Sequence, residues 1–139
     1  GQYMAGMAFG NGGVGLVHAT AHALGGLYNL PHGLLNAILL PHVMRFNQRG
    51  CAGRYAELYA AIAPLKEEVQ TAGGGADAFI SEVERLSRKI GTDIPLHKLG
   101  VRKEDFEAVA EKALKDACCD TNPVCPVRSD IIGILTSAY

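Results

Sequence analysis

Helical periodicity is the feature of this sequence that most restricts the fold that it can adopt. From Ala76 to Ile90, apolar residues recur every three or four positions and charged residues occupy the opposite face, which is typical of an amphipathic helix. The stretch from Lys103 to Ala117 has the same spacing. No run of residues alternates between polar and apolar side chains as a half-buried strand does. We therefore expect an all-α domain.

Glycine, proline and capping residues indicate where further helices begin and end. Pro31 fits just before the start of one helix, Pro64 ends another, and Gly91 is a natural C-cap. The glycine cluster Gly73–Gly75 follows no strand, so we interpret it as a connector rather than a phosphate-binding loop. The additional helices expected are the end of one at Gly1–Ala8, then Val14–Tyr28, Gly33–Asn47, Gly53–Ala63, and one that begins at Ser129 or Asp130.

Composition and charge exclude several classes of function. The 139 residues are 48% hydrophobic and 19% charged, as in one ordinary globular domain. The formal net charge is −1 with both signs interspersed, so we expect no nucleic-acid partner. Apolar runs are too short to span a membrane, and no secretion signal opens the chain, so we expect a cytoplasmic protein. The four cysteines include no CxxC pair and are expected to be free thiols.

Four of the five histidines lie between His18 and His42. His18 and His22 are one helical turn apart and therefore point the same way. His32 begins the next expected helix, beyond the bend at Pro31, and can fold back towards them. An i,i+4 histidine pair with a third imidazole at the start of the next helix predicts a transition-metal site. His42 is about 15 Å further along that helix, so all four cannot bind one ion.

Histidines at this spacing also occur in two other settings. An H-x-x-x-H pair on a helix is also found in zinc proteases, where a glutamate follows the first histidine and acts as general base. Here that position is Ala19, and no carboxylate occurs between Gly1 and Gly50, so a hydrolase of this class is rejected. The plainer alternative is that such histidines serve packing and hydrogen bonding, which we expect of His42, while His97 is expected to be a loop residue.

The segment from Phe9 to Asn47, FGNGGVGLVHATAHALGGLYNLPHGLLNAILLPHVMRFN, closely resembles the signature of the iron-containing (group III) alcohol dehydrogenases. The resemblance continues through GVRKEDF and through a TNP tripeptide ahead of the last helix, so it covers nearly the whole chain. It implies a helical bundle like the C-terminal domain of that family and of the dehydroquinate synthase-like fold. Residues 1–139 would be the C-terminal part of this metal-binding domain. The family's N-terminal α/β domain, which binds NAD(P), is absent from this chain.

The resemblance also assigns roles to individual residues. His18 and His32 match metal ligands, and His22 matches a catalytic residue near the reacting centre. In the family an aspartate and another histidine from an upstream helix complete the metal site. Phe9 and Cys118 match positions that line the substrate pocket; the alternatives are an ordinary core aromatic for Phe9 and a buried thiol for Cys118.

The activity that the resemblance implies is reversible hydride transfer between a small alcohol and NAD or NADP, with an aldehyde or ketone as the product. Fe²⁺ would act as a Lewis acid on the substrate oxygen, and zinc or nickel could substitute for it because imidazoles suit all three metals. The intact enzyme is expected to be a homo-oligomer, and the isolated chain is expected to be inactive. Two alternatives stay open: a relative of the zinc-dependent glycerol dehydrogenases, and a non-enzymatic helical module for metal binding or dimerisation. The pattern PHG-x-x-NA-x-LLPHV favours the iron-dependent branch.

Overall fold

The chain is all-α in the computed structural model, which describes residues 1–62 and 74–139 and contains no strand in those ranges. The expected fold class is therefore confirmed. No helix in the described part of the chain is long and apolar enough to cross a membrane. The α-helices are α1 (Gln2–Gly12), α2 (Gly15–Tyr28), α3 (His32–Ile62), α4 (Gly75–Ile90), α5 (Phe106–Leu114) and α6 (Arg128–Ser137), and short 3₁₀ helices lie at η2 (Leu96–Leu99), η3 (Lys103–Asp105) and η4 (Ala117–Thr121).

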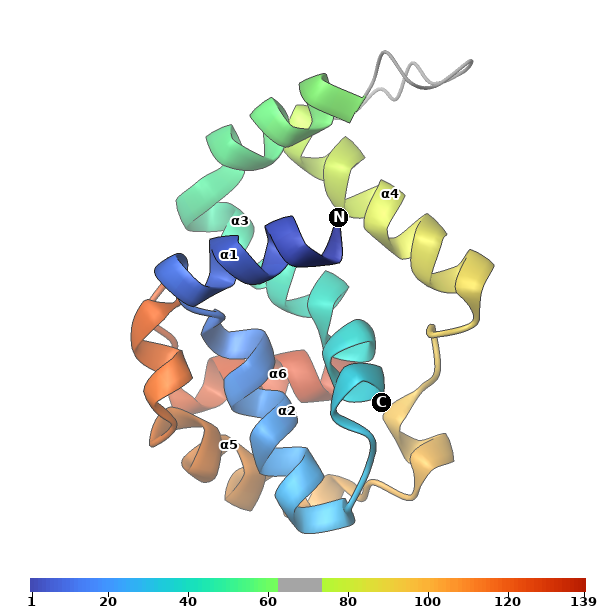
Figure 1. Cartoon of the computed structure of the whole chain (residues 1–139). Coiled ribbons are helices and arrows are strands. Elements are labelled where there is room, and N and C mark those ends of the chain that lie inside the picture. The colour runs from blue at the N-terminus through green and yellow to red at the C-terminus, as the bar shows by residue number, and fades with distance from the viewer. Residues whose placement is uncertain (63–73) are drawn as a thin grey trace.

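Helix α2 lies at the centre of the fold, where it contacts α3, α5 and η4 (Figure 1). Helix α6 packs against both α5 and α3 and closes the core from behind in this view. The core consists of aliphatic side chains that these helices contribute. Its fully buried members include Leu16, Leu24, Leu35, Leu39, Val109, Ile131 and Leu135.

The third and fourth expected helices, Gly33–Asn47 and Gly53–Ala63, are joined in the structure as α3. The boundary between them survives as a kink at Cys51, whose backbone is non-helical (φ −138°, ψ 24°). The Cys51 thiol donates to the Asn47 carbonyl at 3.0 Å, which gives that carbonyl a partner beside the kink. Ala63 and Pro64, at the expected end of this segment, lie outside the described residues.

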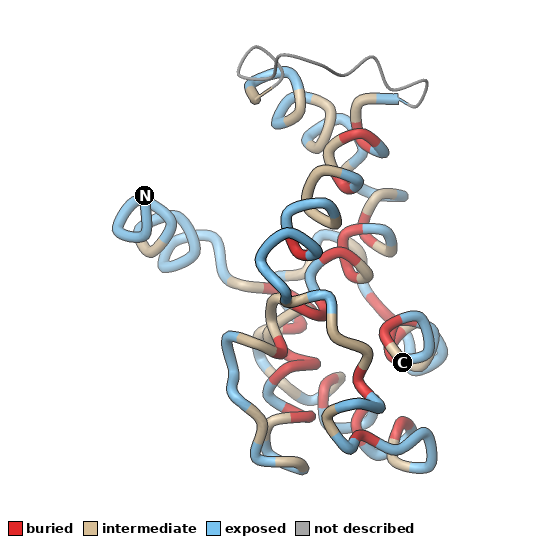
Figure 2. The backbone as a smooth tube through the Cα atoms, turned by 90° about the vertical axis from the view of Figure 1, so that its right-hand side faces the viewer, coloured by how far each residue is buried: buried red, intermediate tan, exposed pale blue. Residues whose placement is uncertain are grey.

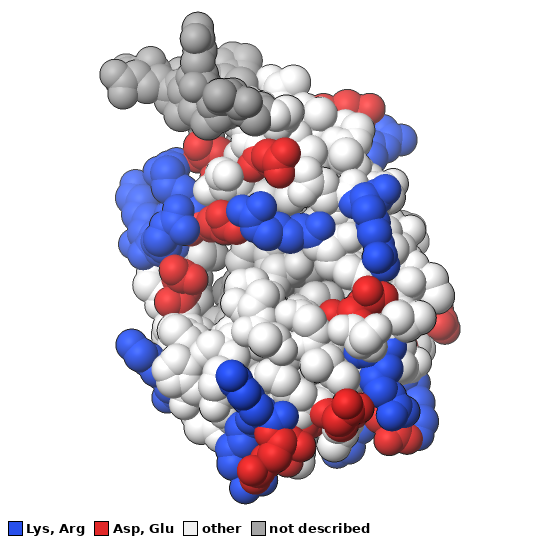
Figure 3. Space-filling view, turned by 180° about the vertical axis from the view of Figure 1, so that it is seen from behind, with Lys and Arg blue, Asp and Glu red and all other residues white. Residues whose placement is uncertain are grey.

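Helix α3 packs along α4 (Figure 1). Polar side chains also connect the two helices. Arg45 pairs with Glu84 at 2.6 Å, and the Gln48 amide donates to Asp77 at 3.0 Å. Seen from behind, acidic and basic residues are mixed over the surface and no single sign dominates (Figure 3). The mixed charge agrees with the small formal net charge of the sequence.

Some helix ends lie where the sequence places them and others differ. The last helix starts one residue before the expected Ser129, with Val127 and not Ser129 or Asp130 at its N-cap. Gly91 ends α4 in the left-handed conformation (φ 75°), as expected of a C-cap. Helix α6 begins at Arg128, where the Asp130 carboxylate accepts the Val127 N–H at 2.9 Å. The expected helix over Lys103–Ala117 is shorter than predicted, because its first turn is the 3₁₀ helix η3 and α5 ends at Leu114.

The early end of α5 has a local cause at Asp116. Its carboxylate accepts the backbone N–H of Cys118 at 2.8 Å and so starts η4 in place of another turn of α-helix. Aspartate side chains compete for backbone N–H groups in this way, which is why they favour helix caps over helix interiors.

Helix α1 has no buried residue and stands away from the other helices (Figure 2). Phe9 is 49% exposed, so the interpretation of this residue as an ordinary core aromatic is wrong for the described chain. The other large apolar side chains exposed on α1 are Tyr3, Met4 and Met7. The connector at Gly73–Gly75 is described only from Gly74, which caps α4.

Candidate metal and catalytic site

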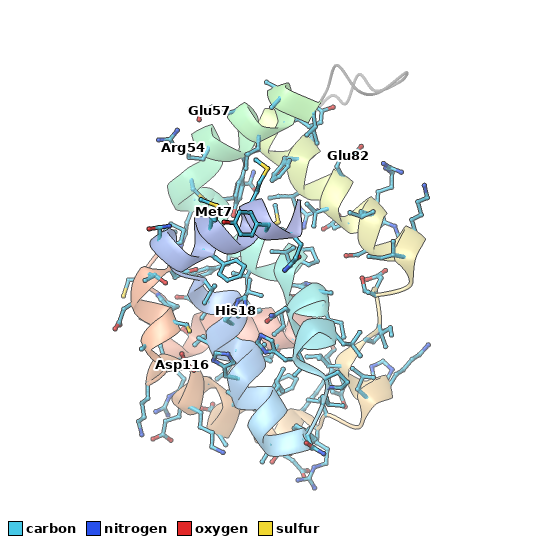
Figure 4. The ribbon with its side chains drawn as sticks, in the orientation of Figure 1. Met7, His18, Arg54, Glu57, Glu82 and Asp116 are labelled. Carbon is cyan, nitrogen blue, oxygen red and sulfur yellow. The ribbon has the colours of Figure 1, made fainter. Side chains whose placement is uncertain are left out.

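Three imidazoles meet where α2 faces the start of α3, and we call His18, His22 and His32 the imidazole cluster. Figure 4 shows His18 on α2. The ring centroids of His18 and His22 are 6.0 Å apart, and His32 lies 5.1 Å from each of them. The structure therefore brings together the three histidines that the sequence grouped by helical spacing.

The cluster forms because the chain reverses sharply between the two helices. Asn29 ends α2 in the left-handed conformation (φ 52°), and its N–H bonds to the Gly25 carbonyl at 2.8 Å. Helix α3 then starts at His32 and packs back along α2. A side chain at Gly25 would already touch Leu35 at 3.6 Å, so the two helices approach closely beside the cluster.

The Nε2 atoms of His18 and His32 converge on one point, which is occupied by the amide nitrogen of Asn36. This Nδ2 atom donates to His32 Nε2 at 2.9 Å and to His18 Nε2 at 3.1 Å. Both Nε2 atoms therefore direct a lone pair at the same place, as two ligands of one cation do. The Oδ1 atom of Asn36 is buried and has no hydrogen-bond partner among the described residues. The donor set fits a transition metal bound through two imidazole nitrogens.

The surroundings of His18 favour the neutral form of its imidazole. Burial lowers the pKa of His18, the neighbouring His32 and His22 lower it further, and the Val14 carbonyl and Asp116 oppose these effects. A neutral imidazole is the form that binds a metal, so the surroundings of His18 favour the ligating state.

His22 has a different partner from the other two histidines. Its Nδ1 atom lies 2.8 Å from the Oδ2 atom of Asp116, in the segment between α5 and η4. Burial raises the pKa of Asp116, but the hydrogen bonds from the Cys118 backbone and from His22 outweigh this and lower it. Asp116 is therefore ionised at neutral pH and accepts the His22 N–H.

Cys118 lies beside this pair. Ligand atoms of His22, Asp116 and Cys118 are within 4.8 Å of one another, so these residues form a second group of potential metal ligands in the described part of the chain. However, burial and the Asp116 carboxylate raise the pKa of the Cys118 thiol, which disfavours the thiolate that binds metals. The Nε2 pair of His18 and His32 is the better candidate for a resident ion.

The remaining histidines lie elsewhere, as expected for His42. Its Nδ1 atom is 3.0 Å from the Ser137 hydroxyl, in a cavity of about 110 Å³ that Asp93 also lines. Burial lowers the pKa of His42. His97 belongs to η2 rather than to a loop, and its Nδ1 atom is hydrogen-bonded to the Tyr139 carbonyl.

Sequence reasoning missed the polar residues that hold this site. Asn36 follows His32 by one helical turn, so its spacing could have identified it. Asp116 is 94 residues from His22 in the sequence, so no local spacing connects the two. Its position two residues before Cys118 indicates a helix cap but not a contact with His22. Thr121 and Asn122, noted only as part of the TNP tripeptide, cap α2 by accepting the N–H groups of Gly15 at 3.2 Å and Leu16 at 3.1 Å.

Comparisons with known proteins identify the family of this chain. The model of the Fe-containing alcohol dehydrogenase family, C-terminal, matches residues 1–139. Lactaldehyde reductase of Escherichia coli (strain K12) is 43% identical over 100% of this chain and 36% of its own length. NAD-dependent methanol dehydrogenase of Bacillus methanolicus is 36% identical over 99% of this chain and 36% of its own.

The fold is also found in a solved structure. The crystal structure of a 1,3-propanediol oxidoreductase superimposes with a TM-score of 0.84 at 43% identity, over 97% of this chain and 35% of that one. The chain thus spans about a third of the length of the relatives that it matches. The family match over all 139 residues and these sequence identities show that the chain belongs to the Fe-containing alcohol dehydrogenase family and corresponds to its C-terminal region.

Proposed function

We propose that this chain is the C-terminal part of the metal-binding domain of a longer NAD(P)-linked alcohol dehydrogenase. The observation that carries the proposal is the convergence of the His18 and His32 Nε2 atoms on one point. The relatives are named as dehydrogenases or reductases of alcohols and aldehydes, and one of them is named as NAD-dependent. Nucleotide binding would belong to an upstream α/β domain, because residues 1–139 contain no nucleotide-binding pattern.

His18 and His32 would hold a divalent metal, Fe²⁺ or a substitute such as zinc or nickel, through their Nε2 atoms. When bound, the metal supplies Lewis-acid polarisation of the substrate oxygen. The Asn36 amide donates to both Nε2 atoms and occupies the point between them, so it would have to withdraw from both rings when a metal binds there. By the resemblance to the family, the further ligands would be an aspartate and a histidine from an upstream helix.

His22 would carry the proton that is exchanged with the alcohol hydroxyl. Oxidation of an alcohol releases a hydride, which nicotinamide accepts, and a proton, which needs a base and a path to water. The His22 ring stacks on the His32 ring at an interplanar angle of 21°, which places it next to a proposed ligand. Its side chain is 44% exposed, so a proton can pass from it to solvent.

Phe9 and Cys118 would line the pocket for a small alcohol or aldehyde. Phe9 stays exposed on α1 and is available to a substrate or to the upstream region. Cys118 is partly buried beside Asp116 and carries a neutral thiol, which suits contact with an apolar part of the substrate.

The function is tested with the full-length protein that contains this chain. Metal-free protein would be reconstituted with Fe²⁺ or zinc, and NAD(P)H formation would be followed with a panel of short alcohols and diols. We expect turnover that depends on the added metal. Higher activity with zinc and glycerol would favour the glycerol dehydrogenase alternative. Stoichiometric metal binding without turnover of any alcohol would support the non-enzymatic module and contradict the proposal.

The isolated chain gives a matched control. Residues 1–139 alone should neither oxidise alcohols nor bind NAD(P) tightly. Weak metal occupancy is compatible with this expectation, because two imidazoles and water can hold zinc or nickel loosely. Clear turnover by the isolated chain would show that the upstream domain is dispensable.

A further inference from the structure

The Asp116 carboxylate connects the end of α5 to the middle of α2. Its Oδ2 atom is 2.8 Å from His22 Nδ1, and its Oδ1 atom is 2.8 Å from the Cys118 backbone nitrogen. Asp116 is labelled in Figure 4. Both oxygens are therefore committed to different partners. The side chain is 23% exposed.

The backbone around Asp116 allows the carboxylate little freedom. The Asp116 N–H bonds to the Ala113 carbonyl at 3.2 Å, and the Asp116 carbonyl accepts the Cys119 N–H at 2.9 Å. With the cap to Cys118, these bonds hold the side chain between two helical segments. Oδ2 is thus presented to His22 from a rigid position.

The partner chemistry decides which nitrogen of His22 carries hydrogen. An ionised carboxylate is only an acceptor, so the Nδ1 atom of His22 must be the protonated nitrogen. The Nε2 atom then keeps its lone pair, which is the form that accepts a proton. A carboxylate that orients an imidazole in this way fixes both the tautomer and the plane of the ring.

We propose that Asp116 is a positioning residue, which holds His22 as the Nδ1–H tautomer with a basic Nε2 atom available to the substrate. This proposal rests on the proposed role of His22 as the proton carrier. Asp116 does not contact the reacting atoms and acts only through the imidazole.

Asparagine at position 116 separates this role from simple capping. In Asp116→Asn, the amide oxygen can still accept the Cys118 N–H, so the cap remains. The amide NH₂ group then faces His22 Nδ1, and two donors cannot share a hydrogen bond. His22 must shift to the Nε2–H tautomer, which has no basic nitrogen on the substrate side.

The experiment compares the metal-loaded full-length protein with its Asp116→Asn, Asp116→Ala, Asp120→Asn and His22→Ala variants. Asp120 is the matched control, because it is an exposed carboxylate on the same 3₁₀ helix. For Asp116→Asn we expect kcat to fall by about 10²-fold while KM changes little, since general acid–base catalysis contributes on this scale. Metal content and melting temperature should stay close to wild type, and Asp120→Asn should keep full activity.

A spectroscopic measurement tests the tautomer without relying on activity. In zinc-loaded protein with isotope-labelled histidine, the nitrogen resonances of His22 should show protonated Nδ1 in the wild type and protonated Nε2 in Asp116→Asn. Wild-type kcat in Asp116→Asn with an unchanged tautomer would overturn the proposal and leave Asp116 as a cap only.

The variant kinetics and the histidine resonances also distinguish a failure of this proposal from a failure of the proposed function. If His22→Ala keeps full activity while Asp116→Asn is slow, Asp116 does not act through His22 and the positioning role is wrong. If the wild type turns over no alcohol, the proposed function fails, but the histidine resonances still decide whether Asp116 sets the tautomer.

Discussion

The side-chain amides of Asn47 and Asn122 hydrogen-bond to each other in both directions. Asn47 Nδ2 donates to Asn122 Oδ1 at 3.0 Å, and Asn122 Nδ2 donates to Asn47 Oδ1 at 2.7 Å. The same Asn122 oxygen accepts the N–H of Leu16, in the first turn of α2. One amide pair thereby connects α3, the segment before α6 and the start of the helix that carries His18 and His22.

Replacing Asn122 should therefore destabilise the fold. Asn122→Ala removes a helix cap and leaves the Asn47 amide, which is only 7% exposed, without its partner. We expect the free energy of unfolding to fall by about 2–3 kcal/mol, the sum of a lost cap and an unsatisfied buried polar group. Denaturant titration measures it. The control is Asn11→Ala, whose exposed amide donates to the Met7 carbonyl within α1 and should change little.

The histidines should separate into three classes. His18→Ala and His32→Ala should each lower metal content together with activity, because each removes one converging Nε2 atom. His22→Ala should leave the metal largely bound but slow turnover by about 10²–10⁴-fold, as expected for an acid–base group. His42→Ala should do neither, because its ring bonds to Ser137 in a separate cavity.

Elemental analysis of metal per subunit, beside turnover for all four variants, makes this comparison. The ligand assignment is wrong if His42→Ala empties the site and His32→Ala does not.

His42 should make stability depend on pH. Burial lowers its pKa below 6.5 in the folded chain, and Glu84 and Asp93 oppose this while Arg45 adds to it. Between pH 6.5 and the lower pKa of folded His42, the unfolded chain binds more protons than the folded chain does. The free energy of unfolding therefore decreases as pH falls through this range. His42→Gln should lose less stability than the wild type between neutral and mildly acid pH. The measurement is the free energy of unfolding from urea titrations at neutral and at mildly acid pH. If the wild type and His42→Gln lose the same amount between these two pH values, His42 does not contribute.

Tyr28 should control the titration of Asp105. The Tyr28 hydroxyl donates to the Asp105 carboxylate and accepts the Arg102 N–H at 3.0 Å. The hydrogen bond from Tyr28 has the largest effect on the pKa of Asp105 and lowers it. Burial raises this pKa, and Arg102 lowers it by a smaller amount than Tyr28 does. This pair stabilises the fold above the unfolded pKa of the carboxyl, and the contribution is lost as pH falls through the folded pKa. In Tyr28→Phe the pKa of Asp105 should rise, as followed by NMR titration of its carboxyl carbon; an unchanged pKa would contradict the assignment.

Helical spacing by itself determined much of this protein. The periodicity of Ala76–Ile90 predicts α4, and the C-cap at Gly91 is where the sequence places it. The i,i+4 spacing of His18 and His22 and the bend before His32 predict that the three rings meet, which they do. These features are local, because hydrogen bonds between residues four apart define a helix and fix which side chains share its face.

Only the tertiary structure decided which distant groups support these rings. Asp116 reaches His22 across 94 residues, and Thr121 caps Gly15 across 106. Helix spacing relates neighbours along the chain and carries no information on such pairs. They exist because α5 and η4 pack against α2, and this packing depends on how apolar side chains from all the helices fill one core.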